Sequence, residues 1–209
     1  MKICLKVAMY APPATGSICG MVSKGNGMDL FTVIKGRRSV RKFRPDPVPS
    51  ELLLEILDAA RWAPSWANTQ CWELIVISDL ETKRKLGEAV PPGNPARAAL
   101  GQAPVVLVAC ARMEKAGYYK GKPATNKGDW YLFDVALFMH TLTLAAHARG
   151  LGSVHIGLFD ARAVAEVLDV PDGVAVVELL PLGYPEGESS PTSRKEVRDF
   201  VSYGKYGGR

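Results

Sequence analysis

The chain has 209 residues, 47% of them hydrophobic and 22% charged, and its formal net charge is +5. These values are typical of one globular domain with a full hydrophobic core, and the charge falls short of the dense basic runs of nucleic-acid-binding arms. The four cysteines are scattered and form no C-x-x-C pair, which argues against a zinc site and against a disulfide-rich secreted scaffold.

The first 27 residues differ from the rest of the chain. They contain a Pro-Pro pair and the stretch SKGNG, and only KICLKVAMY alternates weakly, as a short strand would. Lys6 interrupts the apolar residues before a signal-peptide core can form, and no apolar run in the chain is long enough to cross a bilayer. We therefore expect a loose N-terminal extension at 1–27, one domain at 28–209, a cytoplasmic location and no membrane partner.

Two helices are predicted at the start of this domain. Asp29 is expected to cap a short helix, LFTVIKGR, whose apolar residues fall at helical intervals. Ser50 is expected to cap a longer helix, ELLLEILDAARWA, with acidic residues in its first turn, and Pro64 ends it.

Two buried strands follow. WELIVISD (72–79) and PVVLVACA (104–111) are apolar and rich in β-branched residues, as strands covered on both faces are. Between them the sequence predicts a charged helix at 80–90 and a short helix near 95–102.

The longest predicted helix begins at Asp129 and reads DWYLFDVALFMHTLTLAAHAR. Apolar side chains occupy almost its whole circumference, and such a helix must be buried on every side. In a domain of this size we infer that a second subunit covers one of its faces.

The rest of the domain returns to the sheet. Gly150 and Gly152 end the long helix, and LGSVHIG (151–157) is predicted to be a strand. A helix near 160–168 and a strand, VAVVELLPLGY, come next, before a polar tail that leaves the core. Alternating helices and strands indicate an α/β or α+β fold in which helices cover a central sheet.

The stretch GRRSVRKFRPDP (36–47) packs cations around one serine. Arginine forks, a hydroxyl group and backbone N–H groups that converge from a turn are what a phosphate site needs. A solvated, cationic helix end with nothing bound explains the same residues about as well.

A second polar cluster, APSWANTQCW (63–72), lies between a helix and a strand, where loops often carry function. Ser65, Asn68 and Gln70 offer donors and acceptors suited to the edge of a heteroaromatic ring, and the tryptophans offer flat apolar faces. A turn anchored by buried tryptophans is the alternative interpretation.

A third cluster, GLGSVHIG (150–157), places glycines beside a strand, where the backbone can approach a ligand closely. It does not follow a strand and open a helix with G-x-G-x-x-G spacing, so it fails as a dinucleotide fingerprint. His140 and His147 share a helical face but have no third ligand at a matching spacing, so no metal site is expected.

Taken in order, RRSVRKF, PSWANTQCW, GLGSVHIG-LFD and LGYPEGE with the later SR resemble the FMN-dependent nitroreductase family, from about Met28 to the C-terminus. The resemblance implies an α+β fold of the α/β/α sandwich type, with a central mixed, largely antiparallel sheet. It also implies an intertwined homodimer with FMN at the subunit interface. The implied enzyme is an NAD(P)H oxidoreductase that passes hydride through flavin N5 to a nitroaromatic, quinone or enone acceptor in a ping-pong cycle.

The resemblance also assigns residues to the cofactor, while the flavin itself does the chemistry. Arg37, Ser39 and Arg194 should hold the phosphate and ribityl end, with Arg38 close by. Arg41 should lie near the N1/O2 edge, where reduction places negative charge. The remaining assignments are to the flavin ring. A loop of the second subunit should lie on the pyrimidine side of the ring (Pro64, Ser65, Trp66, Asn68, Gln70). A second segment should face the ring, and one of its backbone N–H groups should reach N5 (His155, Ile156, Gly157, Leu158).

The chain departs from the family pattern at two positions in the loop. Cys71 stands where many members have proline, and its favoured interpretation is a small buried hydrophobe. Trp66 replaces a smaller residue and is expected to narrow the substrate side.

Two other functions stay open at this point. The first is a flavin-binding or flavin-consuming protein without a classical acceptor substrate. The second is a basic nucleic-acid binder acting through residues 35–44, which ranks lower because the stretch lacks interleaved aromatics and a recognisable module. The physiological acceptor and the preference between NADH and NADPH are not encoded in any motif that we identify.

Overall fold

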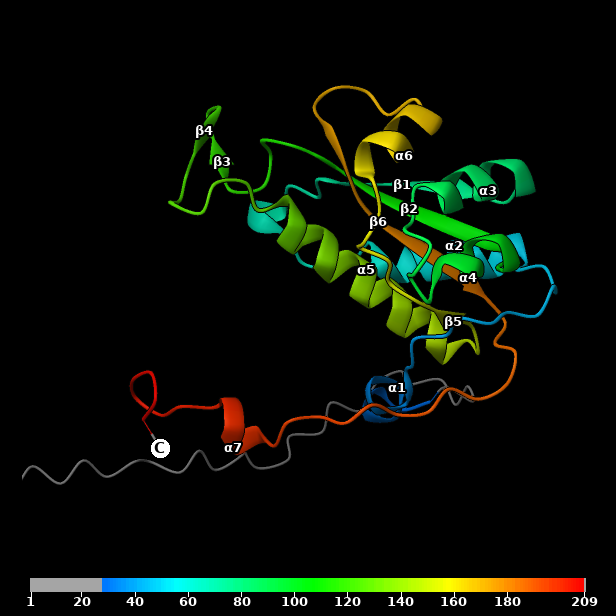
Figure 1. The fold of residues 1–209 in the computed structure, drawn as a ribbon. Coiled ribbons are helices and arrows are strands. Elements are labelled where there is room, and N and C mark those ends of the chain that lie inside the picture. The colour runs from blue at the N-terminus through cyan, green and yellow to red at the C-terminus, as the bar shows by residue number, and fades with distance from the viewer. Residues whose placement is uncertain (1–27, 209) are drawn as a thin grey trace, which may run out of the picture.

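A computed structural model describes residues 28–208, and its centre is a four-stranded sheet (Figure 1). The strands lie in the order β1 (Trp72–Ile77), β2 (Val105–Arg112), β6 (Val174–Gly183) and β5 (Gly152–Ser153), each antiparallel to its neighbour. An isolated parallel bridge joins Ser39 to Ser153. The predicted α+β fold with a mixed, largely antiparallel sheet is confirmed, while the extension at 1–27 and the strand expected in it lie outside the described residues.

Helices cover both faces of this sheet, which makes the α/β/α sandwich. Alternate residues of β2 point to opposite faces, so Leu107 belongs to one hydrophobic cluster and Val106 to the other. The helices divide in the same way: α2 (Ser50–Ala60) and α5 (Tyr131–Ala148) cover the first face, and α3 (Leu80–Glu88), α4 (Arg97–Gln102) and α6 (Ala161–Val167) cover the second. The C-terminal α7 (Val197–Phe200) lies apart from both layers (Figure 1).

The helix starts agree with the predictions only in part. Asp29 does cap α1 (Leu30–Gly36), because its side chain accepts the N–H groups of Phe31 and Thr32. Ser50 is not a cap: it is the first residue of α2, Pro49 precedes it, and the cap position makes no side-chain hydrogen bond. Asp129 does not begin α5, since its carboxylate accepts the N–H of Tyr131 at 3.1 Å and lies in the turn before the helix.

The strand expected at 151–157 is reduced to Gly152–Ser153 and a single bridge between Ile156 and Leu179. The register on β6 is the same in both places, so the ladder is interrupted rather than shifted. The interruption falls opposite Pro181, which has no N–H to donate to the ladder. Three short elements were not predicted: the 3₁₀ turn η1 (Trp66–Asn68), the hairpin of β3 (Tyr118–Tyr119) and β4 (Lys122–Pro123), and α7.

The long helix α5 is covered on one side within the chain and open on the other. Val135, Met139 and Leu142 are completely buried against the sheet, whereas Leu132 is 57% exposed and Phe133 54% exposed. Leu132 and Phe133 therefore leave an apolar face of α5 open, and this is the face that we expect a second subunit to cover. Within residues 28–208, no helix combines the length and the apolar character needed to span a membrane.

Candidate functional site

The cationic stretch lies along the edge of the sheet. The N–H of Val40 donates to the carbonyl of Ser153 at 2.9 Å, and the N–H of Arg44 donates to the carbonyl of Tyr184 at 2.9 Å. In the other direction, the N–H of Glu186 donates to the carbonyl of Lys42 at 3.0 Å. These bonds hold residues 39–44 against β5 and the end of β6, so the cations have a fixed backbone.

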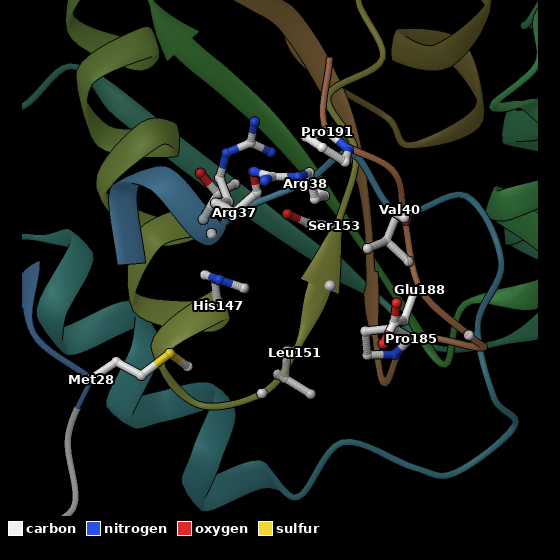
Figure 2. Close-up of a pocket in the computed structure, with 16 residues that line it drawn as sticks. Met28, Arg37, Arg38, Val40, His147, Leu151, Ser153, Pro185, Glu188 and Pro191 are labelled. Carbon is white, nitrogen blue, oxygen red and sulfur yellow. The ribbon is translucent and has the colours of Figure 1, made fainter. Parts of the chain in front are cut away.

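A cavity of about 340 Å³ opens beside this stretch (Figure 2). The end of α1, the last turns of α5, β5 and the segment 185–191 all contribute to its wall. Figure 2 shows Arg37 and Arg38 on one side of it, with His147 below them and Glu188 beside Pro185 on the other side. The cavity is therefore positively charged at one end and apolar along much of its length.

Gly152 lies in this wall, where the neighbouring side chains leave no room for a Cβ atom. A Cβ atom there would lie 2.6 Å from Cγ2 of Val40 and 3.0 Å from Cγ of Pro185. Gly152→Ala is therefore expected to lower the free energy of unfolding by about 1–3 kcal/mol, measured by urea denaturation. Gly87→Ala in α3 is the matched control, because nothing lies within 4 Å of the added atom, and it should raise stability by about 0.5–1 kcal/mol. Equal stabilities of the two variants would contradict the close packing at Gly152.

Arg37 is the most unusual side chain in the cavity. Its Nη1 atom is buried and has no hydrogen-bond partner among the described residues. Burial lowers the pKa of Arg37, and the charges of Arg194 and Arg38 lower it further. Buried polar groups are nearly always hydrogen-bonded, so a guanidinium with a free N–H beside two other cations indicates a place for an anion.

The side chains of the other two arginines, Arg38 and Arg194, donate hydrogen bonds to backbone carbonyls. Arg38 donates to the carbonyls of Lys35 at 2.6 Å and of Arg37 at 2.9 Å. Arg194 donates to the carbonyls of Thr192 and Ser193. Arg37 and Arg38 line the cavity, and Arg194 lies close enough for its charge to lower the pKa of Arg37. This donor set fits the doubly charged phosphate of FMN, which needs several cationic N–H groups.

Two more of the predicted phosphate and ring residues line a pocket that adjoins the cavity. Ser39 and Arg41 lie in this pocket of about 240 Å³, which shares Val40 and Glu188 with the arginine cavity. In that pocket the Nη1 of Arg41 approaches the carbonyl of Ser39 at 3.4 Å. The structure therefore brings Arg37, Arg38 and Arg194 together but places Arg41 beside them rather than among them.

The loop 64–70 is held in an unusual conformation. Ala67, Asn68 and Gln70 have φ values of 43°, 57° and 47°, which lie in the left-handed region. Inside the loop, the N–H of Gln70 donates to Oγ of Ser65 at 3.0 Å, and Nε2 of Gln70 donates to Oδ1 of Asn68 at 3.1 Å. Pro64, Asn68 and Gln70 are exposed, while Ser65 and Trp66 are half-buried, so the loop offers its amide side chains to the outside.

This loop and the arginine cavity lie at opposite ends of α5. Trp66 packs on Trp130, just before the helix begins, with ring centroids 5.3 Å apart. The cavity instead includes His147, in the last turn of the helix. Seventeen residues of helix separate Trp130 from His147, which corresponds to about 25 Å at 1.5 Å per residue. A single chain therefore does not bring the loop and the arginines to one small ligand.

The segment 155–158 lies between these two ends. Ile156 is buried and exchanges both backbone hydrogen bonds with Leu179, whereas Gly157 and Leu158 are exposed. Nδ1 of His155 lies 2.9 Å from a carboxylate oxygen of Glu178, next to a bulge in the β2–β6 pairing. Burial lowers the pKa of His140, and the charges of Arg37 and His155 lower it further. His140 therefore lies close enough to both the arginines and this segment to be affected by their charges.

The thiols of Cys71 and Cys110 are buried, and their surroundings disfavour the thiolate form, which is the reactive one. Burial, with the charge of Asp134, raises the pKa of Cys71 to about 12, and burial with Glu73 raises the pKa of Cys110 to about 11. The favoured interpretation of Cys71 as a small buried hydrophobe is confirmed, since it is 2% exposed.

A pH dependence of stability follows from these thiols. Both pKa values lie above the ordinary 9.0, so the folded state holds these protons more tightly than the unfolded chain does. Stability is therefore expected to fall as the pH rises above 9, because unfolding then releases the two protons. The urea midpoint of wild type should drop more between pH 8 and pH 10 than that of a Cys71→Ala/Cys110→Ala variant; identical slopes would contradict the assignment.

Sequence reasoning missed three contributors to these sites. Ser153 lines the cavity, Glu178 partners His155, and Asp134 is a fully buried acid at the start of α5. Only Asp134 left a readable signal, as a charged residue in an otherwise apolar stretch of helix. Within residues 28–208, no group of three or more His, Cys, Asp or Glu side chains is placed to hold a metal ion.

The chain is similar to a known protein family and to several characterised proteins. The model of the family described as "Nitroreductase family" matches residues 34–96 and 90–184. An NADH dehydrogenase of Thermus thermophilus is 35% identical over 199 residues, covering 83% of this chain and 95% of its own. An FMN reductase (NAD(P)H) of Bacillus subtilis is 32% identical over 79% of this chain and 70% of its own.

Two further matches bear on the cofactor. The solved structure of an FMN-dependent nitroreductase from Clostridium difficile R20291 superposes with a TM-score of 0.71 at 26% identity, over 85% of this chain and all of the other. A 5,6-dimethylbenzimidazole synthase of Rhodospirillum rubrum is 32% identical over 76% of this chain and 83% of its own. The similarity therefore extends through the described domain and includes proteins with more than one named activity.

Proposed function

This chain belongs to the nitroreductase family and is an FMN-dependent NAD(P)H oxidoreductase, and we propose that it delivers hydride to an electron-poor acceptor. The acceptor class is a nitroaromatic, a quinone or an enone, each able to take up hydride. The observation that carries the proposal is the Nη1 atom of Arg37, which is buried, has no hydrogen-bond partner among the described residues and belongs to a side chain close to Arg38 and Arg194. A small phosphate is the anion that would complete this cluster.

The residues of the chain bind and orient, and bound FMN supplies the hydride-transfer chemistry. Arg37, Arg38 and Arg194 hold the phosphate, with Ser39 nearby. Arg41 supplies a positive charge that favours the reduced, more negative state of the cofactor. The segment His155, Ile156, Gly157 and Leu158 faces the ring, with an exposed backbone at Gly157 to meet it.

A homodimer completes the site. The open face of α5 carries Leu132 and Phe133, and the tail adds exposed apolar residues at Val197, Phe200 and Tyr203. Pairing two α5 helices antiparallel about a twofold axis would bring the start of one helix to the end of the other. The loop Pro64, Ser65, Trp66, Asn68 and Gln70 of one subunit would then meet the arginine cavity of the second, across the separation that one chain cannot close.

The proposal is tested with the purified protein and added FMN. We expect retention of FMN through gel filtration, a two-band visible spectrum, and NADH or NADPH oxidation that depends on an added quinone. Initial rates at varied quinone should give the parallel double-reciprocal lines of a ping-pong cycle. A colourless protein that ignores FMN would rule the proposal out.

The second candidate function is a flavin-consuming protein without a classical acceptor, and the match to a relative named for a synthesis rather than a reduction keeps it open. It gives a different experimental result. In an oxidoreductase, the visible absorbance that NAD(P)H bleaches returns in full when quinone is added. In a flavin-consuming protein, reduced flavin is destroyed in air, so the visible absorbance of oxidised flavin does not return. The recovered fraction of flavin, measured by chromatography after one cycle, separates the two.

A further inference from the structure

We propose that Asp134 is a positioning residue that holds the loop 64–70 in the conformation in which it meets the cofactor. This inference rests on the proposed function, since only there does the loop contact FMN. Asp134 touches no part of the arginine cavity and would act through the loop alone.

The side-chain hydrogen bonds of Asp134 all go to this loop and to Cys71, which follows it. Its side chain is 0% exposed, in the first turn of α5. The backbone N–H of Trp66 donates to both carboxylate oxygens, at 3.0 and 3.1 Å, and the hydroxyl of Thr69 donates to Oδ2 at 3.3 Å. The thiol of Cys71 lies 3.7 Å from the same oxygen. One carboxylate thus ties two positions of the loop, and the residue that follows it, to a rigid helix.

This carboxylate has no cationic partner in the described part of the chain. A buried charge is costly unless it is well hydrogen-bonded, so its stability depends on the loop donors and on the positive end of the α5 dipole. The dependence is mutual. If the loop moves away, the carboxylate loses its partners, and this penalty keeps the loop closed on the helix.

The loop needs such an anchor because its backbone is strained. Three of its non-glycine residues have left-handed φ values, a conformation that persists only when the surroundings impose it. Internal bonds alone, such as the N–H of Thr69 donating to the carbonyl of Trp66 at 2.8 Å, shape the turn but do not attach it to the fold. Asp134 attaches it, on the side opposite to the exposed amides of Asn68 and Gln70.

The first arm of the test needs no cofactor. Hydrogen–deuterium exchange of the apoprotein should be about tenfold faster in a peptide covering 65–71 in Asp134→Ala, with an intermediate effect in Asp134→Asn, which keeps one acceptor. Leu142→Ala is the matched control. It removes a fully buried side chain of the same helix and lowers the melting temperature, but it lies outside the loop contacts, so exchange at 65–71 should stay at the wild-type level.

The second arm measures the FMN dissociation constant by fluorescence quenching. Asp134→Ala should raise it about tenfold, because a loosened loop must be reordered on binding, while Leu142→Ala should leave it unchanged. Unchanged loop exchange in Asp134→Ala would overturn the anchoring role. Faster exchange with unchanged FMN affinity would overturn the positioning role. A wild-type protein that does not bind FMN would end the proposed function instead, and the exchange arm would then decide alone whether Asp134 holds the loop.

Discussion

Arg37→Ala is expected to weaken FMN binding by about a hundredfold while leaving the apoprotein at least as stable as wild type. The first effect arises because two charge-assisted hydrogen bonds to a phosphate contribute about 3 kcal/mol together. The second arises because Arg37 is a half-buried cation with a buried, unpaired Nη1 close to two other arginines, so removing it relieves desolvation and repulsion.

Arg44→Ala is the matched control for this variant. Arg44 comes from the same cationic stretch, but it pairs with Asp46 at 3.2 Å and lies over the ring of Tyr184. FMN affinity by titration calorimetry and apoprotein melting temperature should therefore be near wild type. Equal FMN affinities of the two alanine variants would show that the cavity at Arg37 is not the phosphate site.

Leu132→Glu is expected to dissociate the proposed homodimer, with a dissociation constant raised about a hundredfold or more. Leu132 is 57% exposed on the open face of α5, where the proposed partner would bury the new carboxylate in an apolar contact. The change should not unfold the helix, because an acidic residue in the first turn is favourable to the helix dipole. Sedimentation velocity gives the oligomeric state, and FMN binding should be lost along with the dimer.

Leu80→Glu is the corresponding control on α3. Leu80 is 49% exposed and also lies in the first turn of its helix, but on the opposite layer of the sandwich. The same substitution should leave mass and FMN affinity unchanged there. A Leu132→Glu protein that remains dimeric would show that the open face of α5 is not the interface.

The errors of the sequence analysis have identifiable physical causes. Serine at position 50 has the right chemistry for a cap, but Pro49 holds the preceding backbone extended and takes the cap position itself. The strand at 151–157 fails at a point that the printed sequence contains, since Pro181 cannot donate to its neighbour. Pro49 is next to the residue that it affects, whereas Pro181 affects a segment that is distant in the chain, which the propensity of that segment could not show.

The sequence by itself determined three of the four strands of the main sheet (β1, β2 and β6), the helix that is apolar all round, and the three clusters that resemble a flavin site. These depend on the periodicity and chemistry of residues close together in the chain, which one stretch of sequence expresses in full. Only the tertiary structure decided that Nη1 of Arg37 is buried without a partner in the described residues, that the loop at 64–70 lies at the far end of α5 from it, and that Asp134 accepts hydrogen bonds from that loop. These facts depend on packing and on contacts between residues more than sixty positions apart, which no local pattern specifies.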